Sequence, residues 1–323
     1  MVQHFFATII VVGSFIARAE AAGPVDTAGP ATVVVDTAGP AKVVVDTLKA
    51  VDSLPVKKHM VKRSHPEIGM TYQSNDVYLG RRDSARLPYF IPAVSYYHKS
   101  GLFATASVDY LKTAAVSRVD LVSVDAGYMF TAHKYDGTFT LTKYWYNSQS
   151  TNVASDIRAA IAYMNGYDLG FIKPRLTTTL NFGDKVDFEG IFDLEHTFVF
   201  FHDDMDVTPT FSVAGSTLHF YDYYRRRKYK LTKNAKKKAG VANVTGSVVD
   251  ASAFRIMDYE PSLPLEYSIG KFTVNFTPTY AIPVNPATID VHTVKENGVA
   301  TDRMKQEKIG NTFFFTCEVS FLF

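Results

Sequence analysis

The stretch that decides the fold is Val186–Phe201, VDFEGIFDLEHTFVFF, because apolar and polar residues alternate along most of it. The even positions carry the apolar side chains of Val186, Phe188, Phe192, Leu194, Phe198 and Phe200. The odd positions carry the polar side chains of Asp187, Glu189, Asp193, Glu195 and Thr197. Successive side chains of a β-strand point to opposite faces, so this alternation predicts a strand with one apolar and one charged face.

The same alternation returns in several other segments of roughly ten residues. It is clearest in Leu102–Tyr110, Ile157–Tyr163, Ile172–Phe182, Phe272–Pro283 and Phe313–Phe323. Aromatic clusters stand at predicted strand ends, namely Tyr96-Tyr97, Tyr144-Trp145-Tyr146 and Tyr221 with Tyr223-Tyr224. A soluble sandwich also alternates, but strands of this length with aromatic ends match the span and the girdles of a membrane barrel. We therefore predict an all-β fold, a transmembrane antiparallel up-and-down β-barrel.

Loop lengths support a barrel of about twelve strands. We place the strands at residues 68–79, 89–98, 102–112, 117–130, 138–147, 155–165, 169–182, 186–201, 207–222, 252–269, 272–284 and 309–323. Barrels of this class have short periplasmic turns and longer outer loops. The connections assigned to the periplasm are short, whereas the long ones, 223–251 and 285–308, both fall outside. Only the turn at 183–185 is a short connection on the outer side.

The first 66 residues precede the predicted barrel. An apolar run, Phe5–Ile16, and the small residues of Ala19-Glu20-Ala21 predict a secretory signal peptide at 1–21, although no Lys or Arg precedes the run. A buried N-terminal helix or strand is the alternative. Residues 22–66 hold the repeated decapeptide VDTAGPATVV, whose Gly-Pro breaks helix and strand, so we predict a flexible periplasmic tether. The tether is a spacer or the docking segment of a periplasmic or outer-membrane protein partner.

Composition excludes several classes of protein and site. The 323 residues include 24 Phe and 19 Tyr against one Trp, and the net charge is only +2. A single cysteine, Cys317, excludes an intrachain disulfide and any multi-cysteine metal site. The acidic turn Asp203–Asp206 lacks the Gly and the distant Glu of a calcium loop. We expect no metal, no cofactor and no nucleic-acid partner.

The final strand, Phe313–Phe323, carries Phe313, Phe315, Cys317, Val319, Phe321 and Phe323 on one face and ends on an aromatic residue. It resembles the C-terminal strand signature of bacterial outer-membrane barrels. The resemblance implies that Val319, Phe321 and Phe323 form a signal for the barrel-assembly machinery and that the chain resides in the bacterial cell outer membrane. The segment Pro261–Pro283 is similar to hairpins of uncharacterised barrels from the Bacteroidota. The class-level resemblance covers residues 67–323.

Hairpin register predicts which charges meet inside the barrel. A three-residue turn at 183–185 pairs Arg175 with Asp193 and Lys173 with Glu195, and such opposite charges stabilise by about 0.2–1 kcal/mol. With Arg158 placed in the same neighbourhood, the predicted lumen charge band is Arg158, Lys173, Arg175, Asp187, Glu189, Asp193 and Glu195. The band is either a constriction that orients polar solutes or an ion-pair network that fills a narrow barrel.

A basic segment, Arg225–Lys238, holds nine of the chain's 34 basic residues and no acidic one. Its members are Arg225, Arg226, Arg227, Lys228, Lys230, Lys233, Lys236, Lys237 and Lys238. Such a cluster favours contact with a polyanion. Facing outward, it would bind outer-membrane lipids, including lipopolysaccharide phosphates; the alternative is a solvated, disordered loop.

The sequence is compatible with two functional classes. The first is a structural or accessory outer-membrane protein, or a narrow pore with a charged lumen. The second is a passive channel for small polar or charged solutes. A lipid hydrolase would need a constellation such as His219 with Ser216 or Thr217, but no G-x-S-x-G or H-E-x-x-H motif occurs. We expect no catalytic residues.

Overall fold

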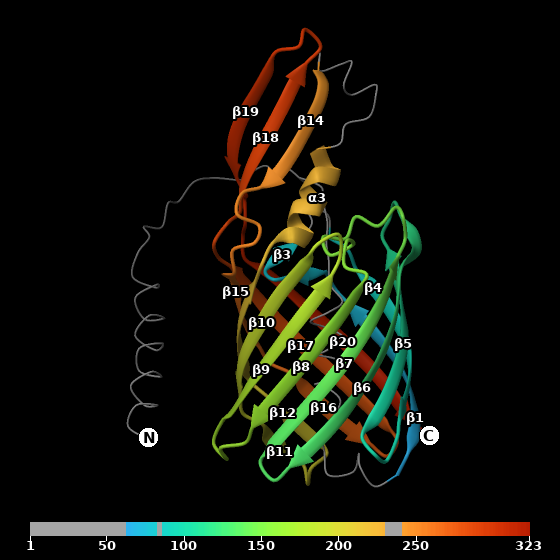
Figure 1. Ribbon diagram of the computed structural model, residues 1–323. Helices are drawn as coiled ribbons and strands as arrows, with labels where there is room; N and C mark the ends of the chain where they lie inside the picture. Colours follow the sequence, from blue (N-terminus) through green and yellow to red (C-terminus); the bar gives the residue numbers. More distant parts are fainter. Residues whose placement is uncertain (1–62, 83–85, 230–240) are drawn as a thin grey trace, which may run out of the picture. The chain divides into compact units, whose positions relative to one another are not determined.

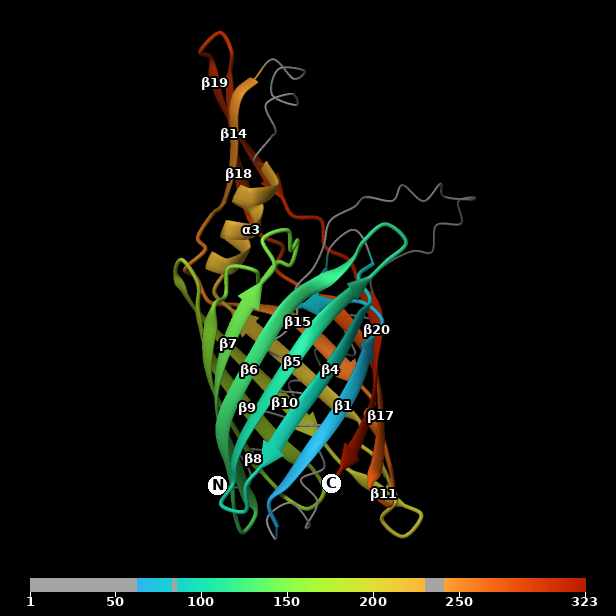
Figure 2. The same cartoon turned by 90° about the vertical axis from the view of Figure 1, so that its right-hand side faces the viewer.

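Twelve antiparallel strands close into a barrel (Figure 1, Figure 2). The computed structural model describes residues 63–82, 86–229 and 241–323. The wall strands are β1 (His65–Gln73), β4 (Tyr89–Tyr97), β5 (Leu102–Lys112), β6 (Ser117–Ala132), β7 (Tyr135–Tyr146), β8 (Ala159–Tyr167), β9 (Lys173–Phe182), β10 (Val186–Glu195), β13 (Thr210–Ser216), β15 (Arg255–Ser262), β17 (Phe272–Pro283) and β20 (Thr312–Leu322). Each pairs with the next, and β20 also pairs with β1. The predicted twelve-stranded barrel is confirmed.

Three short strands continue the wall beyond β10, β13 and β15. They are β11 (Phe198–Phe200), β12 (Met205–Val207) and β16 (Leu265–Ile269), paired in the order β11, β12, β16 and β17. Pro209 and Pro264 stand at the interruptions, where a residue without an N–H breaks the ladder. Their carbonyls still accept hydrogen bonds, from the backbone N–H of His196 at 3.3 Å and of Thr208 at 2.9 Å. The strands are therefore interrupted at the prolines, while β11, β12 and β16 continue the pairing.

The two ends of the barrel differ. Strand β1 begins and β20 ends at the same end, which the turns 98–101, 133–134 and 270–271 also close. The long connections lie at the opposite end, which in barrels of this class is extracellular. We call these the inner and the outer end.

The long outer connections are folded, which corrects the prediction of loops at 223–251 and 285–308. They contain helix α3 (His219–Tyr229) and a three-stranded sheet of β14 (Val241–Val248), β18 (Thr288–Lys295) and β19 (Ala300–Gln306), in that order (Figure 1). The strand predicted at 207–222 ends at Ser216, because Leu218, Tyr221 and Tyr224 bury their side chains at helical spacing. Among the described residues, no helix is both long and apolar enough to span a membrane.

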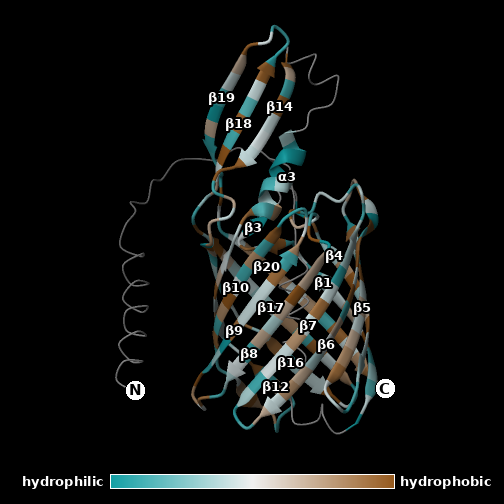
Figure 3. Ribbon diagram, in the orientation of Figure 1, coloured by the Kyte–Doolittle hydropathy of each residue, from teal (hydrophilic) through white to brown (hydrophobic). Residues whose placement is uncertain are grey.

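Many large apolar side chains of the barrel wall are exposed, and hydrophobic and hydrophilic residues are interspersed along its strands (Figure 3). On β9 and β10 the even-numbered side chains Leu176, Leu180, Val186, Phe188 and Phe192 are exposed, as predicted. On β20 Phe313 and Val319 face outward while Phe314 is buried. A closed barrel satisfies every backbone ladder bond within the wall, so it can present this surface to lipid. We therefore place the protein in the bacterial outer membrane.

Only part of the predicted aromatic girdle faces lipid. Tyr96 and Trp145 are exposed, but their neighbours Tyr97 and Tyr144 point inward and are buried. Tyr221 and Tyr224 lie on α3 and are also buried, so their expected position beside the lipid headgroups is wrong. The alternation of strands separates adjacent aromatic residues onto opposite faces.

Strand boundaries near the N-terminus also differ from the prediction. The first strand begins at His65, three residues before its predicted start at 68, and ends at Gln73 rather than at 79. Residues 155–158, predicted to start a strand, belong to the connection before β8. The predicted signal peptide and nearly all of the predicted tether lie outside the described residues.

Charged substitutions on β10 should show which of its outward-facing residues lie near the middle of the bilayer. Phe192 stands near the middle of the strand and Val186 at its outer end, with 41% and 50% of their surfaces exposed. We expect Phe192→Arg to lower the free energy of unfolding by about 2–4 kcal/mol and Val186→Arg by about 0–1 kcal/mol, because the cost of an arginine rises toward the bilayer midplane. Urea unfolding in lipid vesicles measures both. Equal costs would contradict the assigned lipid face.

Candidate functional site

The first outer connection folds into the mouth of the barrel. After β1 the chain forms a small hairpin, β2 (Val77–Tyr78) and β3 (Arg81–Arg82), and every residue from Gln73 to Arg81 is buried. Leu79 and Gly80 make the turn with φ angles of 50° and 71°. A Cβ atom on Gly80 would lie 2.7 Å from Asp258 Cβ, so only glycine fits against strand β15. We call residues 77–82 the mouth hairpin.

Tyr78 joins the mouth hairpin to the barrel wall. Its hydroxyl donates a hydrogen bond to Glu189 Oε2 at 2.6 Å, and Asn181 Nδ2 donates to the same oxygen at 3.3 Å. Its ring packs edge-on against Phe220, with the centroids 5.0 Å apart. Complete burial, followed by the negative charge of Glu189, raises the pKa of Tyr78 well above its usual value. The hydroxyl therefore keeps its proton and remains a donor to the carboxylate.

Arg81 joins the mouth hairpin to the base of the outer sheet. Its guanidinium forms a buried ion pair with Glu307 at 3.2 Å and donates to the carbonyls of Leu79 and Asn285. Glu307 follows β19 and also accepts hydrogen bonds from the Tyr221 hydroxyl at 2.5 Å and the Ala287 N–H at 3.0 Å. Burial and the charge of Glu307 raise the pKa of Tyr221. One carboxylate thus fixes three separate segments.

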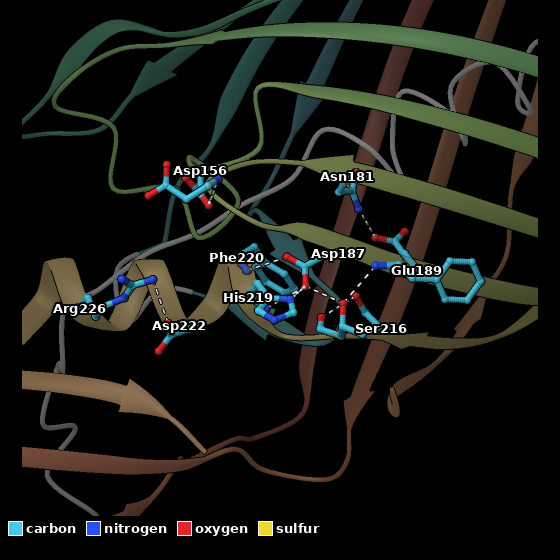
Figure 4. Close-up of polar contacts among 12 residues, drawn as sticks. Asp156, Asn181, Asp187, Glu189, Ser216, His219, Phe220, Asp222 and Arg226 are labelled. Carbon is cyan, nitrogen blue, oxygen red and sulfur yellow. Dashed lines mark hydrogen bonds and ion pairs between the residues drawn. The ribbon is translucent and has the colours of Figure 1, made fainter. Parts of the chain in front are cut away.

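Asp187 anchors helix α3 across the mouth (Figure 4). Its carboxylate accepts hydrogen bonds from the backbone N–H groups of His219 at 2.8 Å and Phe220 at 2.7 Å, and from the Thr217 hydroxyl at 2.6 Å. The free N–H groups and the dipole at a helix N-terminus both favour a negative charge there. Asp187 therefore caps the helix from the barrel wall rather than facing an open lumen.

An apolar core fills the space between these polar anchors. It unites the mouth hairpin, the connection before β8, helix α3 and the inner faces of several wall strands. Its largest fully buried members are Tyr78, Leu121, Val153, Ile157, Leu218, Phe220 and Met257. Leu121 lies on β6 and Met257 on β15, so the core connects distant parts of the wall across the barrel. The outer end is packed with side chains.

The predicted register of the β9–β10 hairpin is confirmed, since Arg175 pairs with Asp193 and Lys173 with Glu195. The Arg175 side chain pairs diagonally with Glu195, whereas Lys173 contacts both Asp136 of β7 and its directly opposite residue, Glu195. Arg175 Nη2 contacts Glu195 Oε1 at 2.9 Å, and Lys173 Nζ lies 2.7 Å from Asp136 Oδ1 and 3.8 Å from Glu195 Oε1. These residues form an ion-pair cluster toward the inner half of the wall.

The remaining members of the predicted band have other positions. Asp187 lies at the outer mouth, where it caps helix α3, and Glu189 lies there as the acceptor of the Tyr78 hydroxyl. Arg158 is wrongly placed in the band, because its largely exposed side chain pairs with Asp184, at 2.5 Å, and with Asp156 in the outer connections. Asp156 also accepts a hydrogen bond from the Asp184 N–H, and burial raises its pKa. Arg158 lies just before β8, where the sequence pattern had suggested a strand.

The described part of the basic segment is a helix held against the protein. Arg226 pairs with Asp222 at 2.9 Å, and Arg227 donates to Ser155 Oγ and to the Ser150 carbonyl, each at 2.8 Å. Arg225 and Lys228 lie over the rings of Tyr221 and Tyr224. The alternative of a solvated, disordered loop is therefore wrong for residues 225–228, which are helical. Lys230, Lys233, Lys236, Lys237 and Lys238 lie outside the described residues.

The side chains considered for hydrolysis are engaged in structural contacts. His219 Nδ1 lies 3.2 Å from Asp187 Oδ1, while the Ser216 hydroxyl donates to the Thr217 carbonyl at 2.8 Å. Within the described ranges, no group of three or more His, Cys, Asp or Glu residues could hold a metal ion. The contact with Asp187 holds the N-terminus of the helix, and the Ser216 hydroxyl proton is donated to a backbone carbonyl.

The residues of the proposed assembly signal lie in the strand that closes the barrel. Val319 and Phe321 pair with Met70 and Ile68 of β1, and Phe321 packs against Phe272 and Phe323 with centroids 4.8 Å apart. Their role as a signal stays a prediction.

The comparisons with known proteins concern the architecture. No family model and no curated protein matches the chain. Among solved structures it is similar to CdiB from Acinetobacter baumannii, at 9% identity and a TM-score of 0.36, over 81% of this chain and 60% of that one. It is also similar to a porin, at 11% identity and 0.28, over 81% and 99% of the two chains, and to Pseudomonas aeruginosa OprD, at 8% and 0.28, over 82% and 96%. Likenesses this low carry no conclusion about activity or substrate.

Sequence reasoning missed the mouth hairpin and Glu307. The hairpin was included in a strand running to residue 79, although the polar run Gln73-Ser74-Asn75-Asp76 and the glycine at 80 interrupt the alternation. That interruption is the available signal. Glu307 has no local signal, because its partners Arg81 and Tyr221 are distant in sequence.

Loss of the buried ion pair should destabilise the mouth. We expect Arg81→Met to lower the free energy of unfolding by about 3–5 kcal/mol, because Glu307 is left charged and buried. Arg82→Met, at the exposed neighbouring position, is the matched control and should cost less than about 0.5 kcal/mol. Denaturant unfolding measures both, and equal losses would show that the ion pair contributes nothing.

Proposed function

We propose that this protein is an outer-membrane barrel with a closed extracellular mouth and a structural or accessory role. The observation that carries the proposal is the mouth hairpin, which Tyr78 ties to Glu189 and Arg81 ties to Glu307. Both contacts are buried, and the apolar core fills the space around them. A passive channel needs a continuous water path, and the buried side chains at the outer end of the described part of the chain support a closed mouth instead.

The outer sheet is the surface through which an accessory role would act. All seven residues of β19 are exposed, and β19 is an edge of its sheet. Edge strands present unpaired backbone groups that can accept a strand from another protein. The barrel would then anchor this sheet at the cell surface.

A gated passage for small cations is the second candidate. The inward-facing carboxylates favour it, provided that the mouth hairpin can leave its place. An enzymatic role has no support in the contacts of His219 and Ser216.

Other parts of the proposal stay predictions from the sequence. They are lipid-phosphate contact by the basic segment, recognition of the final strand by the assembly machinery, a protein partner for the tether, and kinship with barrels of the Bacteroidota.

Conductance in planar bilayers separates the two candidates. We expect no steady channel from the wild-type protein, because side chains fill the outer end. The double variant Tyr78→Ala with Arg81→Ala should open a cation-preferring channel by releasing both anchors of the mouth hairpin. Arg82→Ala, in the same hairpin, is the control and should behave as wild type.

Heat-modifiable gel mobility confirms that each variant is folded before it is measured. Steady conductance of the wild type, matched by Arg82→Ala, would contradict the closed mouth and favour a passive channel. A silent but folded double variant would show that the hairpin is not what closes the barrel.

A further inference from the structure

The two edges of the outer sheet differ in what lies beside them. The strand order is β14, β18 and β19, so β14 and β19 are the edges (Figure 1). Helix α3 engages the β14 edge, where Asp222 accepts the hydrogen bond from the Val248 N–H. In the described part of the chain no strand pairs with the outer side of β19, and all of its residues are exposed. An extended segment can therefore pair with β19 and not with β14.

The hydrogen bonds of the β18–β19 hairpin show which backbone groups of β19 point outward. At the turn the Lys295 N–H donates to the Val299 carbonyl at 2.9 Å. In an antiparallel pair the hydrogen-bonded positions recur at every second residue, and the register from Ala300 to Gln306 has no bulge. The odd-numbered residues of β19 therefore bond to β18. The N–H and carbonyl groups of the even-numbered residues, which include Met304, point away from the sheet.

The exposed side chains of β19 form two faces of different charge. Arg303 and Lys305 lie on one face, directly opposite apolar residues of β18, so neither cation faces a carboxylate across the strand pair. Asp302 lies on the other face, where His292 Nδ1 contacts its Oδ1 at 2.5 Å. Opposite charges across a strand pair are stabilising. The face with two cations at alternate positions thus favours a strand that carries acidic side chains at alternate positions.

The same charges disfavour a second copy of β19 as the pairing strand. When two identical edge strands pair antiparallel about a two-fold axis, each side chain meets one of the same face, so odd positions meet odd positions. The central registers then place Asp302 opposite Asp302, Arg303 opposite Arg303, or Arg303 opposite Lys305 of the other copy. Like charges directly opposite each other destabilise a strand pair. The charges on β19 therefore exclude one partner and select another.

We propose that β19 binds, by strand addition, an extended acidic segment of another protein at the cell surface. Carboxylates at alternate positions of that segment would face Arg303 and Lys305. Main-chain hydrogen bonds to the even-numbered residues supply affinity, and the two cations supply specificity. The inference rests on the proposed accessory role, for which it names the chemistry of the partner.

Peptide binding to the full-length protein in phosphatidylcholine vesicles tests the proposal. The probe is a synthetic peptide in which Glu alternates with Val, and its counterpart carries Lys in place of Glu. We expect the wild type to bind the Glu peptide at least about tenfold more tightly than the Lys peptide, because two opposite-charge pairs replace two like-charge pairs. The double variant Arg303→Glu with Lys305→Glu should reverse this preference.

A proline on the edge tests backbone pairing separately from charge. Met304→Pro removes an outward N–H but no hydrogen bond to β18, so the outer sheet should stay folded; hydrogen exchange of the β18 amides checks this. We expect the variant to weaken binding of the Glu peptide by about tenfold, although every charge is retained. Met304→Ala keeps the N–H and is the matched control, which should bind as the wild type does.

Four results would overturn the proposal. Binding of the Glu peptide that survives Met304→Pro would show adsorption to basic groups without strand pairing. Equal binding of the two peptides, or binding of neither, would show that the edge selects no acidic strand. A wild-type dimer that Met304→Pro dissociates would assign the edge to a second copy. Conductance plays no part in these measurements, so a conducting wild type that still binds the Glu peptide would overturn the closed mouth alone.

Discussion

Closure of the sheet by the pairing of β1 with β20 is the constraint on which the rest of the structure depends. Hydrocarbon offers no hydrogen bonds, so a sheet that crosses it must satisfy its edges within itself. Seven residue pairs, from Glu67–Leu322 to Gln73–Thr316, join the first and last strands. Closure then reverses the usual burial pattern, because the apolar face of each strand meets lipid and the polar face is enclosed.

Because the polar faces of the strands are enclosed, their carboxylates lie inside the barrel and lose hydration. Each carboxylate brought inward needs a donor or a positive charge nearby. At the outer end the donors are the Tyr78 hydroxyl, the Arg81 guanidinium and the N-terminus of α3. Toward the inner half Arg175 and Lys173 supply part of the charge. The same requirement explains why donors are packed around the carboxylates of the mouth.

The sequence was sufficient for those features that depend on local alternation. The register of the β9–β10 hairpin followed from parity and a three-residue turn, and the lipid face of β20 followed from its alternate aromatic residues. The mouth hairpin did not follow, because Tyr78 and Arg81 find their partners more than 100 residues away. Helix α3 was missed for a related reason: its cap, Asp187, lies on another strand, and the residue directly before the helix, Leu218, is not a capping type.

The residues that hold the mouth hairpin also hold the base of the outer sheet. Glu307 directly follows β19, and Asn285, whose carbonyl accepts a hydrogen bond from Arg81, precedes β18. Helix α3 is joined to the same sheet, because Asp222 accepts a hydrogen bond from the Val248 N–H at 2.7 Å. Since Arg81 and Tyr221 share Glu307, displacement of the sheet's base would break the anchors of the hairpin and the helix together. The mouth hairpin, helix α3 and the base of the outer sheet are therefore held together by one set of contacts.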